Sequence, residues 1–186
     1  RSDFEVTQPS EWRHLRWRGC SVEPTRELRG DAASDSPLAI FRGIHFENCD
    51  FRGSAFLNCA FEDCIFERCN LSGGLFGDCL FRNCEFREMG MGMASSTGFF
   101  GCRFEKGATF TDCYLVQFTI ADGEAGRTQV DEQGIRFSGG VMWSSRFEGI
   151  DFNAGGALDL SETENQEDNW FEDENSVVGR LKRKSD

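Results

Sequence analysis

The chain has 186 residues and a net charge of −12, which suits one folded domain and argues against nucleic-acid binding, since that needs a basic surface. Phenylalanine occurs 19 times and tyrosine once, so the aromatic side chains suit a dry interior. No stretch approaches the roughly 18 apolar residues of a membrane span, so we expect no membrane insertion, although association with a membrane-protein complex stays open.

At the start of the chain, a small or apolar residue precedes a large one by two positions in three short units. The units are Ser10/Trp12, Leu15/Trp17 and Cys20/Val22. Residues 23–38 are polar and contain Pro24 and Pro37, so they are predicted to be a surface excursion.

A strict five-residue period governs residues 39–91. A large apolar residue stands at every fifth position: Phe41, Phe46, Phe51, Phe56, Phe61, Phe66, Leu71, Phe76, Phe81 and Phe86. Cysteine keeps its own register two positions earlier, at Cys49, Cys59, Cys64, Cys69, Cys79 and Cys84. These sixteen residues are the predicted structural core.

A period of five fits neither an α-helix nor a flat strand. Two inward side chains in every five residues suit a chain that turns a corner every five residues, so that four corners close a square of about twenty residues, stacked at the strand spacing of about 4.8 Å. The second position after each large residue carries turn formers, as a corner requires. They are Gly43, Asn48, Gly53, Asn58, Asp63, Gly73, Asp78 and Asn83.

The units Cys49-Asp50-Phe51-Arg52-Gly53 and Cys69-Asn70-Leu71-Ser72-Gly73 resemble the pentapeptide-repeat family, whose pattern is a small residue, Asp or Asn, Leu or Phe, then two free positions. Other units depart from it at the second position, with Ala60, Ile65, Leu75 and Leu80. The resemblance implies an all-β fold, a right-handed quadrilateral β-helix in which each turn contacts only its neighbours. We expect roughly six turns in a single domain over residues 1–157.

Downstream, looser units continue the pattern, with one extra residue at Gly107. They are Cys102/Phe104, Ala108/Phe110, Cys113/Leu115, Ile135/Phe137, Gly140/Met142, Ser145/Phe147 and Ile150/Phe152. Residues 89–98 and 121–134 are predicted to be loops that leave the coil. Residues 158–186 are predicted to be an acidic tail with a basic tip, because residues 159–174 hold eight acidic residues and no Lys or Arg.

The nine cysteines are interpreted as buried small hydrophobic residues. Zinc sites favour cysteines two to four residues apart, whereas these are more widely spaced; a metal or redox role is the alternative. No Gly-rich phosphate loop, G-x-S-x-G or H-E-x-x-H pattern occurs, and His45 is expected to face solvent. We therefore expect no catalytic residue, no metal and no cofactor, and a chain that is not an enzyme.

Two sets of residues are candidates for partner binding. Ile40, Ala60 and Leu80 are predicted to form an outward apolar column with Leu75 around the corner, which is either a contact surface or is covered by the chain itself. Trp170 and Phe171 lie within the acidic tail and resemble a docking peptide. Beside the apolar column, the outward charges Arg42, Glu62 and Arg82 are predicted to form a ladder.

The sequence therefore predicts a non-catalytic protein–protein interaction module, an accessory or scaffold subunit of a larger assembly whose protein partner is unidentified. The family resemblance implies two alternatives: a DNA mimic that binds and protects a type II topoisomerase, and a bacterial effector scaffold. A DNA mimic needs negative charge along its length, but residues 40–120 hold ten acidic and seven basic residues, a net of −3. A soluble protein of the cytoplasm, or of an organelle or plastid compartment such as the thylakoid lumen after removal of a targeting peptide, fits the chain.

Overall fold

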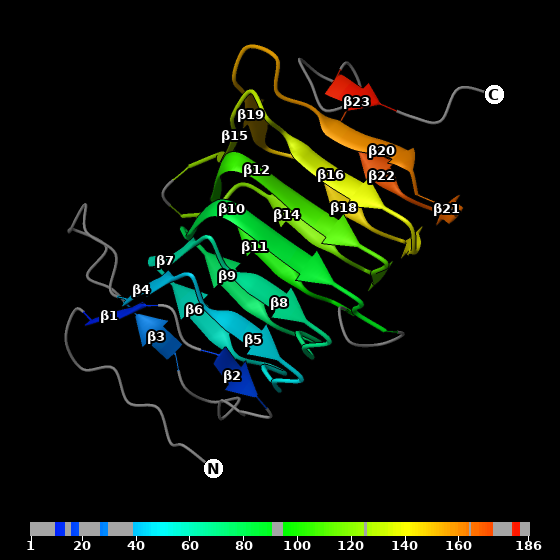
Figure 1. The fold of residues 1–186 in the computed structure, drawn as a ribbon. Coiled ribbons are helices and arrows are strands. Elements are labelled where there is room, and N and C mark those ends of the chain that lie inside the picture. Colours follow the sequence, from blue (N-terminus) through cyan, green and yellow to red (C-terminus); the bar gives the residue numbers. More distant parts are fainter. Residues whose placement is uncertain are drawn as a thin grey trace.

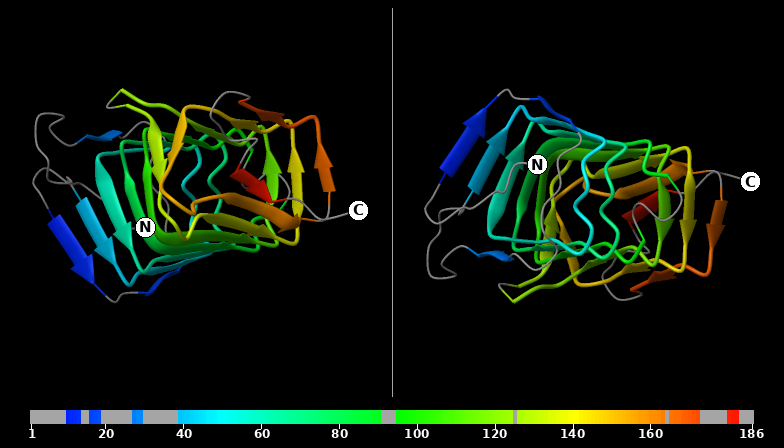
Figure 2. Two further views of the ribbon diagram at one scale, coloured as in Figure 1. Left: turned by 90° about the horizontal axis from the view of Figure 1, so that it is seen from above. Right: turned by 90° about the horizontal axis from the view of Figure 1, so that it is seen from below.

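The computed structural model describes residues 10–13, 16–18, 27–29, 39–90, 95–124, 126–163, 165–172 and 180–182. These residues form parallel β-strands wound into a solenoid, with the N-terminal strands at one end and the C-terminal strands at the other (Figure 1). Both views in Figure 2 show the chain closing on itself in each turn. The predicted all-β solenoid of roughly six turns is confirmed. No helix in the described part of the chain is long and apolar enough to cross a membrane.

The strands stack in four rows, which we call faces 1 to 4 in the order in which the chain visits them. Faces 1 and 2 share one 13-stranded sheet, because β10 and β12 continue around the corner between them. Face 1 holds β1 (Ser10–Arg13), β4 (Ala39–Arg42), β7 (Cys59–Glu62), the first halves of β10 (Leu80–Arg87) and β12 (Arg103–Thr111), β15 (Thr128–Val130) and β19 (Ile150–Phe152). Face 2 holds β2 (Arg16–Arg18), β5 (His45–Glu47), β8 (Ile65–Glu67), the second halves of β10 and β12, β16 (Ile135–Ser138), β20 (Leu158–Glu162) and β23 (Leu181–Lys182).

Faces 3 and 4 are separate sheets. Face 3 begins with a bridge between Asp50 and Asn70 and continues with three strands: β13 (Tyr114–Val116), β17 (Val141–Trp143) and β21 (Asn165–Glu167). Face 4 has seven strands: β3 (Glu27–Arg29), β6 (Ala55–Leu57), β9 (Leu75–Gly77), β11 (Gly98–Phe100), β14 (Thr119–Ala121), β18 (Arg146–Phe147) and β22 (Trp170–Phe171).

The corners have the left-handed backbone conformation that the turn formers were expected to supply. All eight predicted corner residues have φ between 50° and 67°. Glycine adopts this conformation without strain, and Asn and Asp tolerate it better than other residues do. Arg68 has the same conformation at its corner, with φ of 52°, although it is not a turn former.

The interior is a stack of phenylalanine rings lined by cysteines. The structure places all sixteen predicted core residues inside, with no more than 5% of any of them exposed. Rings in successive turns stack nearly parallel: the ring centroids of Phe41 and Phe61 are 4.9 Å apart, and those of Phe61 and Phe81 are 5.1 Å apart. Each turn therefore buries its large residues against those of its neighbours, and burial of this kind is the main favourable term in folding.

The cysteines also satisfy buried backbone carbonyls. The thiols of Cys64 and Cys84 donate hydrogen bonds to the carbonyl oxygens of Phe41 and Phe61, each at 3.2 Å and each in the preceding turn. The hydroxyl of Thr97 donates a hydrogen bond in the same way to the carbonyl oxygen of Leu71. All eight described cysteines are buried and none of them forms a disulfide within the described residues; Cys20 lies outside these residues. Burial raises the pKa of Cys113 to about 12.

Three segments differ from the sequence prediction because parts of them rejoin the coil. β3 lies within the expected excursion at 23–38 and pairs with β6, and β15 lies within the expected loop at 121–134 and pairs with β12 and β19. Residues 91–94 of the expected loop at 89–98 lie outside the described residues, and its last residue, Gly98, begins β11. The extra residue near Gly107 is confirmed as a β-bulge opposite the corner of β10.

The C-terminal segment continues the solenoid past the boundary expected at residue 157. β20, β21 and β22 pair with the preceding turn, and β23 pairs with β20. Leu158 and Leu160 are fully buried, and the ring of Phe171 stacks on Phe147 at 5.1 Å. The acidic C-terminal segment can therefore form a further turn of the solenoid, because only its few inward positions must be apolar.

Candidate protein-binding surface

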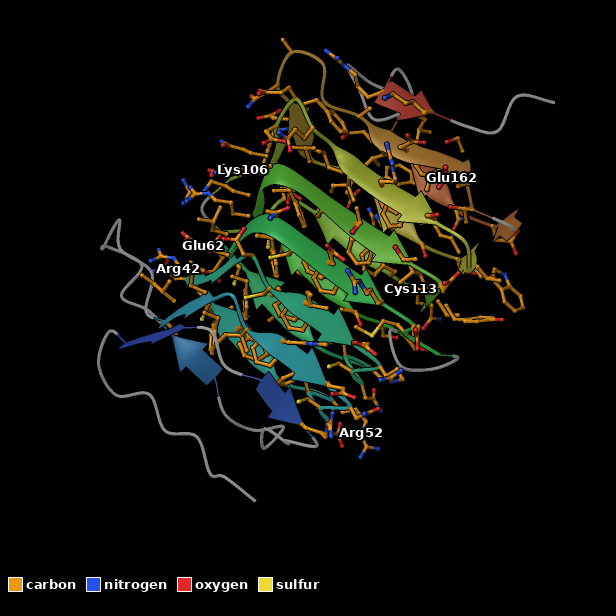
Figure 3. All side chains as sticks on the ribbon, in the orientation of Figure 1. Arg42, Arg52, Glu62, Lys106, Cys113 and Glu162 are labelled. Atoms are coloured by element: carbon orange, nitrogen blue, oxygen red, sulfur yellow. The ribbon has the colours of Figure 1, made fainter. Side chains whose placement is uncertain are left out.

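Face 1 carries a ladder of paired charges. Arg42 lies 2.6 Å from Glu62, and Arg82 lies 3.2 Å from Glu62 and 2.6 Å from Glu105. The predicted ladder of alternating charges is confirmed and extends one turn further; Figure 3 labels Arg42 and Glu62 near its N-terminal end. The ladder neutralises the acids of this face within the chain.

Face 2 carries a second network of charges around a buried carboxylate. Glu47 is only 7% exposed and pairs with Arg18 at 2.9 Å and Arg68 at 3.2 Å. Arg68 also lies 2.6 Å from Glu67, which in turn contacts His45 at 2.8 Å. His45 thus pairs with a carboxylate on its own face.

The predicted apolar column on face 1 presents little surface. Ala60 is 2% exposed, because it lies in register between the larger Ile40 and Leu80 of the neighbouring turns, and both of these are half-buried. This column also lies beside the ladder of charges. Face 1 therefore offers a partner mainly paired ions.

Face 4 is uncharged at every outward position across four consecutive strands, β6, β9, β11 and β14. These positions are Ala55, Leu57, Leu75, Gly77, Gly98, Phe100, Thr119 and Ala121. Leu75 is 37% exposed. Large side chains lie over the glycines: a Cβ on Gly77 would be 2.6 Å from Cδ2 of Leu57, and one on Gly98 would meet the ring of Phe100. The result is an even apolar surface.

Face 3 carries exposed aromatic residues on β13 and β17. Tyr114 is 39% exposed and Trp143 is 48% exposed, with Val116 and Val141 half-buried beside them. The indole Nε1 of Trp143 donates a hydrogen bond to Asp168 at 3.4 Å, which fixes one edge of the ring. Faces 3 and 4 are adjacent, so these aromatic residues continue the apolar surface around a corner.

The structure separates the two aromatic residues that resembled a docking peptide. Trp170 is 49% exposed on face 4, and the guanidinium of Arg146 lies 5.2 Å from its ring centroid. Phe171 is half-buried and extends the internal stack of rings. Of the pair, Trp170 is the one that a partner could contact.

The exposed large apolar side chains of the described residues gather on one side of the molecule. Leu75 and Trp170 lie on face 4, and Tyr114 and Trp143 on face 3. The sequence analysis named the first two and missed the second two. Tyr114 and Trp143 flank the inward Leu115 and Met142, so the spacing of the looser units was the signal that could have found them.

The described residues contain no group of three or more His, Cys, Asp or Glu side chains placed to hold a metal ion. A cavity between the later turns, lined in part by Phe110, Cys113 and Met142, has a volume of about 10 Å³. That is room for one water molecule at most. The surface of faces 3 and 4, with its exposed apolar side chains, is therefore the candidate binding site.

Residues 38–85 match the family described as pentapeptide repeats (9 copies). No curated protein matches the chain by sequence. Similar solved structures include two trypsin-treated variants of QnrB1, a plasmid-mediated fluoroquinolone resistance protein. The first is 20% identical, with 83% of this chain and 74% of that chain covered and a TM-score of 0.29; the second is 17% identical, with 80% and 73% covered and a TM-score of 0.31. Full-length QnrB1 is 14% identical, with 94% and 92% covered and a TM-score of 0.27. The resemblance to the pentapeptide-repeat family that the sequence predicted is confirmed by this match over residues 38–85.

Proposed function

We propose that the chain is a non-catalytic protein-binding module, a scaffold or accessory subunit, and that its partner binds the apolar and aromatic surface of faces 3 and 4. The observation that carries this proposal is the gathering of exposed Leu75, Tyr114, Trp143 and Trp170 on these two faces. The cores of protein interfaces are enriched in Tyr and Trp and depleted in charge, and contiguous apolar patches mark contact sites.

The rigidity of the solenoid favours binding by this surface. The backbone under Tyr114 and Trp143 is paired on β13 and β17, and their inward neighbours Leu115 and Met142 are buried. Side chains held on a packed sheet lose little freedom when a partner binds, which lowers the entropic cost of association.

The chemistry of the titratable groups supports a non-catalytic role. Reactive cysteines are partly exposed and have lowered pKa values, whereas burial raises the pKa of Cys79 and Cys84. His45 is engaged by Glu67.

The charge pattern gives less support to a topoisomerase-binding DNA mimic. A mimic would present acids without partners along its length, but on faces 1 and 2 Glu47, Glu62, Glu67 and Glu105 each pair with an arginine. A gyrase supercoiling assay tests the alternative directly. Strong inhibition, or protection from a quinolone, would replace the present proposal.

The experiment that tests the proposal is affinity capture from an extract of the source cells, followed by mass spectrometry. The baits are the full chain, the double variant Tyr114→Ser/Trp143→Ser and the matched control Arg103→Ser/Arg136→Ser, which removes two exposed side chains from the charged side. We expect a stoichiometric partner that the control retains and the aromatic variant loses by about tenfold or more. Equal capture by the aromatic variant would contradict the proposed surface.

A further inference from the structure

We propose that Trp143 and Asp168 form a site for an arginine side chain of the partner protein. The inference rests on the proposed function, because it uses the same surface and names the chemistry of the partner that binds there. Trp143 is 48% exposed on face 3, and its indole Nε1 donates a hydrogen bond at 3.4 Å to Oδ2 of Asp168, which is also exposed. A ring with a carboxylate at its edge offers a guanidinium both a surface to stack on and an acceptor for its N–H groups.

Face 4 of the same chain holds an arginine in this way. The guanidinium of Arg146 lies 5.2 Å from the ring centroid of Trp170, and its Nη2 lies 2.6 Å from Oε2 of Glu148. Arg146 and Trp170 are in register on the neighbouring strands β18 and β22. One guanidinium is therefore held by an indole ring and a carboxylate at once.

Trp143 and Asp168 supply the same two groups without the cation. Within the described ranges, Arg146 is the only cation placed over a tryptophan ring. Glu148 and Glu172 each pair with an arginine of the chain, whereas Asp168 forms no ion pair with any described residue. An arginine from another protein would complete the arrangement that face 4 completes by itself.

The backbone around the site is held in place. Asp168 is the corner residue between β21 and β22, with φ of 52°. The side chain of the next residue, Asn169, accepts a hydrogen bond from the backbone N–H of Ser145 at 2.9 Å and donates one to the carbonyl oxygen of Met142 at 3.0 Å. These two bonds join the corner to the turn that carries Trp143, so the ring and the carboxylate are positioned before a partner arrives. Such preorganisation lowers the entropic cost of binding.

The site should prefer arginine to lysine. A guanidinium is planar and weakly hydrated, so it can lie flat on the ring of Trp143 while its N–H groups reach the carboxylate of Asp168. That carboxylate keeps lone pairs beyond the one that the indole engages. An ammonium group is a compact and strongly hydrated charge, and it gains less from the ring.

The charge of the chain favours a basic partner in general. Asp168 lies within residues 159–174, which hold eight acidic residues and no Lys or Arg, and the whole chain has a net charge of −12. A field of this sign speeds the approach of any basic segment. It does not choose between arginine and lysine, so a preference for arginine would identify the contribution of the ring and the carboxylate.

Titration of the full chain with short Gly-Ser peptides tests the site. The peptides are identical except for one central residue, which is arginine, lysine or the neutral arginine analogue citrulline. The readout is the NMR signal of the Nε1–H group of Trp143, which is identified by its loss in Trp143→Leu. We expect the arginine peptide to shift this signal and to bind about fivefold more tightly than the lysine peptide, and the citrulline peptide to leave it in place. A signal that does not move, or that moves equally with lysine, would overturn the proposal.

Asp168→Asn tests the carboxylate with little effect on the fold, because Asn tolerates the corner conformation as Asp does. This variant should weaken binding of the arginine peptide by about threefold. Asp63→Asn is the matched control, since Asp63 is also an exposed corner residue, with φ of 53°, and accepts a hydrogen bond from Nδ2 of Asn83 at 2.8 Å. The control should bind the peptide as the native chain does. Equal weakening in both variants would show a general attraction between charges and no site.

Trp143→Leu tests the ring while it keeps the position apolar. The preference for arginine over lysine, measured from the NMR signals of the peptides themselves, should disappear in this variant. Persistence of the preference would mean that the indole does not hold the guanidinium, and the proposal would fail.

The peptide titration and the partner capture fail separately. If Tyr114→Ser/Trp143→Ser loses the partner while the arginine and lysine peptides bind alike, the surface binds its partner without an arginine, and only the present inference fails. If the arginine peptide shifts the signal of Trp143 while this double variant captures the partner as the native chain does, the arginine site stands and the proposed binding surface fails.

Discussion

Faces 1 and 2 and faces 3 and 4 share one core and one repeat, yet they present different surfaces. On faces 1 and 2 the outward positions carry ions that pair from turn to turn, as in Arg42–Glu62–Arg82–Glu105. On faces 3 and 4 they carry Leu75, Tyr114, Trp143 and Trp170. The difference lies entirely in side chains that point away from the core.

In this fold, the residues that specify the coil are different from the residues that specify its surface. Inward residues and corners set the coil, so that outward positions can hold residues of very different polarity. A salt ladder uses the outward positions to stabilise neighbouring turns by modest amounts. An apolar surface contributes little to the stability of the isolated chain, because its side chains remain in contact with water.

Alkaline pH should destabilise the charged and the apolar side together, because the buried thiols lie in the core that both sides share. Burial holds the pKa of Cys79 and Cys84 well above the unfolded value of about 8.5 and raises the pKa of Cys113 to about 12. Below pH 8.5 the thiols are protonated in both states and their contribution is complete. As the pH rises from about 8.5 toward the folded pKa, the unfolded chain loses protons first, and the free energy of unfolding falls by up to about 1.4 kcal/mol per pH unit for each thiol.

Urea unfolding between pH 7 and pH 10 under a reductant measures this effect. Since several thiols titrate together, we expect a larger loss of stability than from any single substitution. Cys113→Ala should make the pH dependence shallower. A free energy of unfolding that stays constant from pH 8 to pH 10 would show that the thiols do not remain protonated in the folded chain.

Removal of one core ring should also affect both sides, to a smaller extent. Phe81 is fully buried and contacts rings of the turns on either side, so Phe81→Ala is expected to lower the free energy of unfolding by about 4 kcal/mol. Phe100 is half-buried on face 4, and Phe100→Ala should cost about 1 kcal/mol. Equal losses in the two variants, measured by urea unfolding, would contradict the division into inward and outward residues.

Neutralising the buried carboxylate should affect the charged side alone. Glu47 is held between Arg18 and Arg68, so Glu47→Gln removes charge-assisted hydrogen bonds and should cost about 2 kcal/mol. Glu85 is more exposed and pairs with Arg87 at the surface, so Glu85→Gln should cost less than about 0.5 kcal/mol. Thermal unfolding of both variants measures the contrast, and a similar small shift in both would show that burial of Glu47 adds nothing.

The core and the corners could be predicted from the sequence because each is set by a local rule. Phe, Cys and the turn formers recur at a fixed spacing, and Asn48 and Asp63 adopt the corner conformation that the spacing implied. The extent of the coil was harder to predict. Acids occupy outward positions of the C-terminal segment, so its composition resembles that of a disordered tail. The few inward residues that extend the stack are Leu158, Leu160 and Phe171.

The surface could be predicted only in part, because exposure depends on residues in the neighbouring turns. Ala60 points outward, yet it is buried between Ile40 and Leu80. Leu75 has Ala55 on one side and Gly98 on the other, so it remains exposed. A period of five identifies the outward positions, but the sizes of the side chains above and below decide which of them a partner can reach.

The smallest expected difference between the two sides is in how their stability depends on salt. Arg82 bridges Glu62 and Glu105 on face 1, so Arg82→Met should cost about 0.5 kcal/mol at low ionic strength and almost nothing near 1 M salt, where the Debye length falls to about 3 Å. Thr119→Val on face 4 lies among uncharged residues, and its effect should be equally small but independent of salt. Thermal unfolding of the two variants at low and high salt makes the comparison. If the Arg82→Met difference persisted unchanged at high salt, the contribution of Arg82 would come from the packing of its aliphatic stem against face 1 rather than from the ladder.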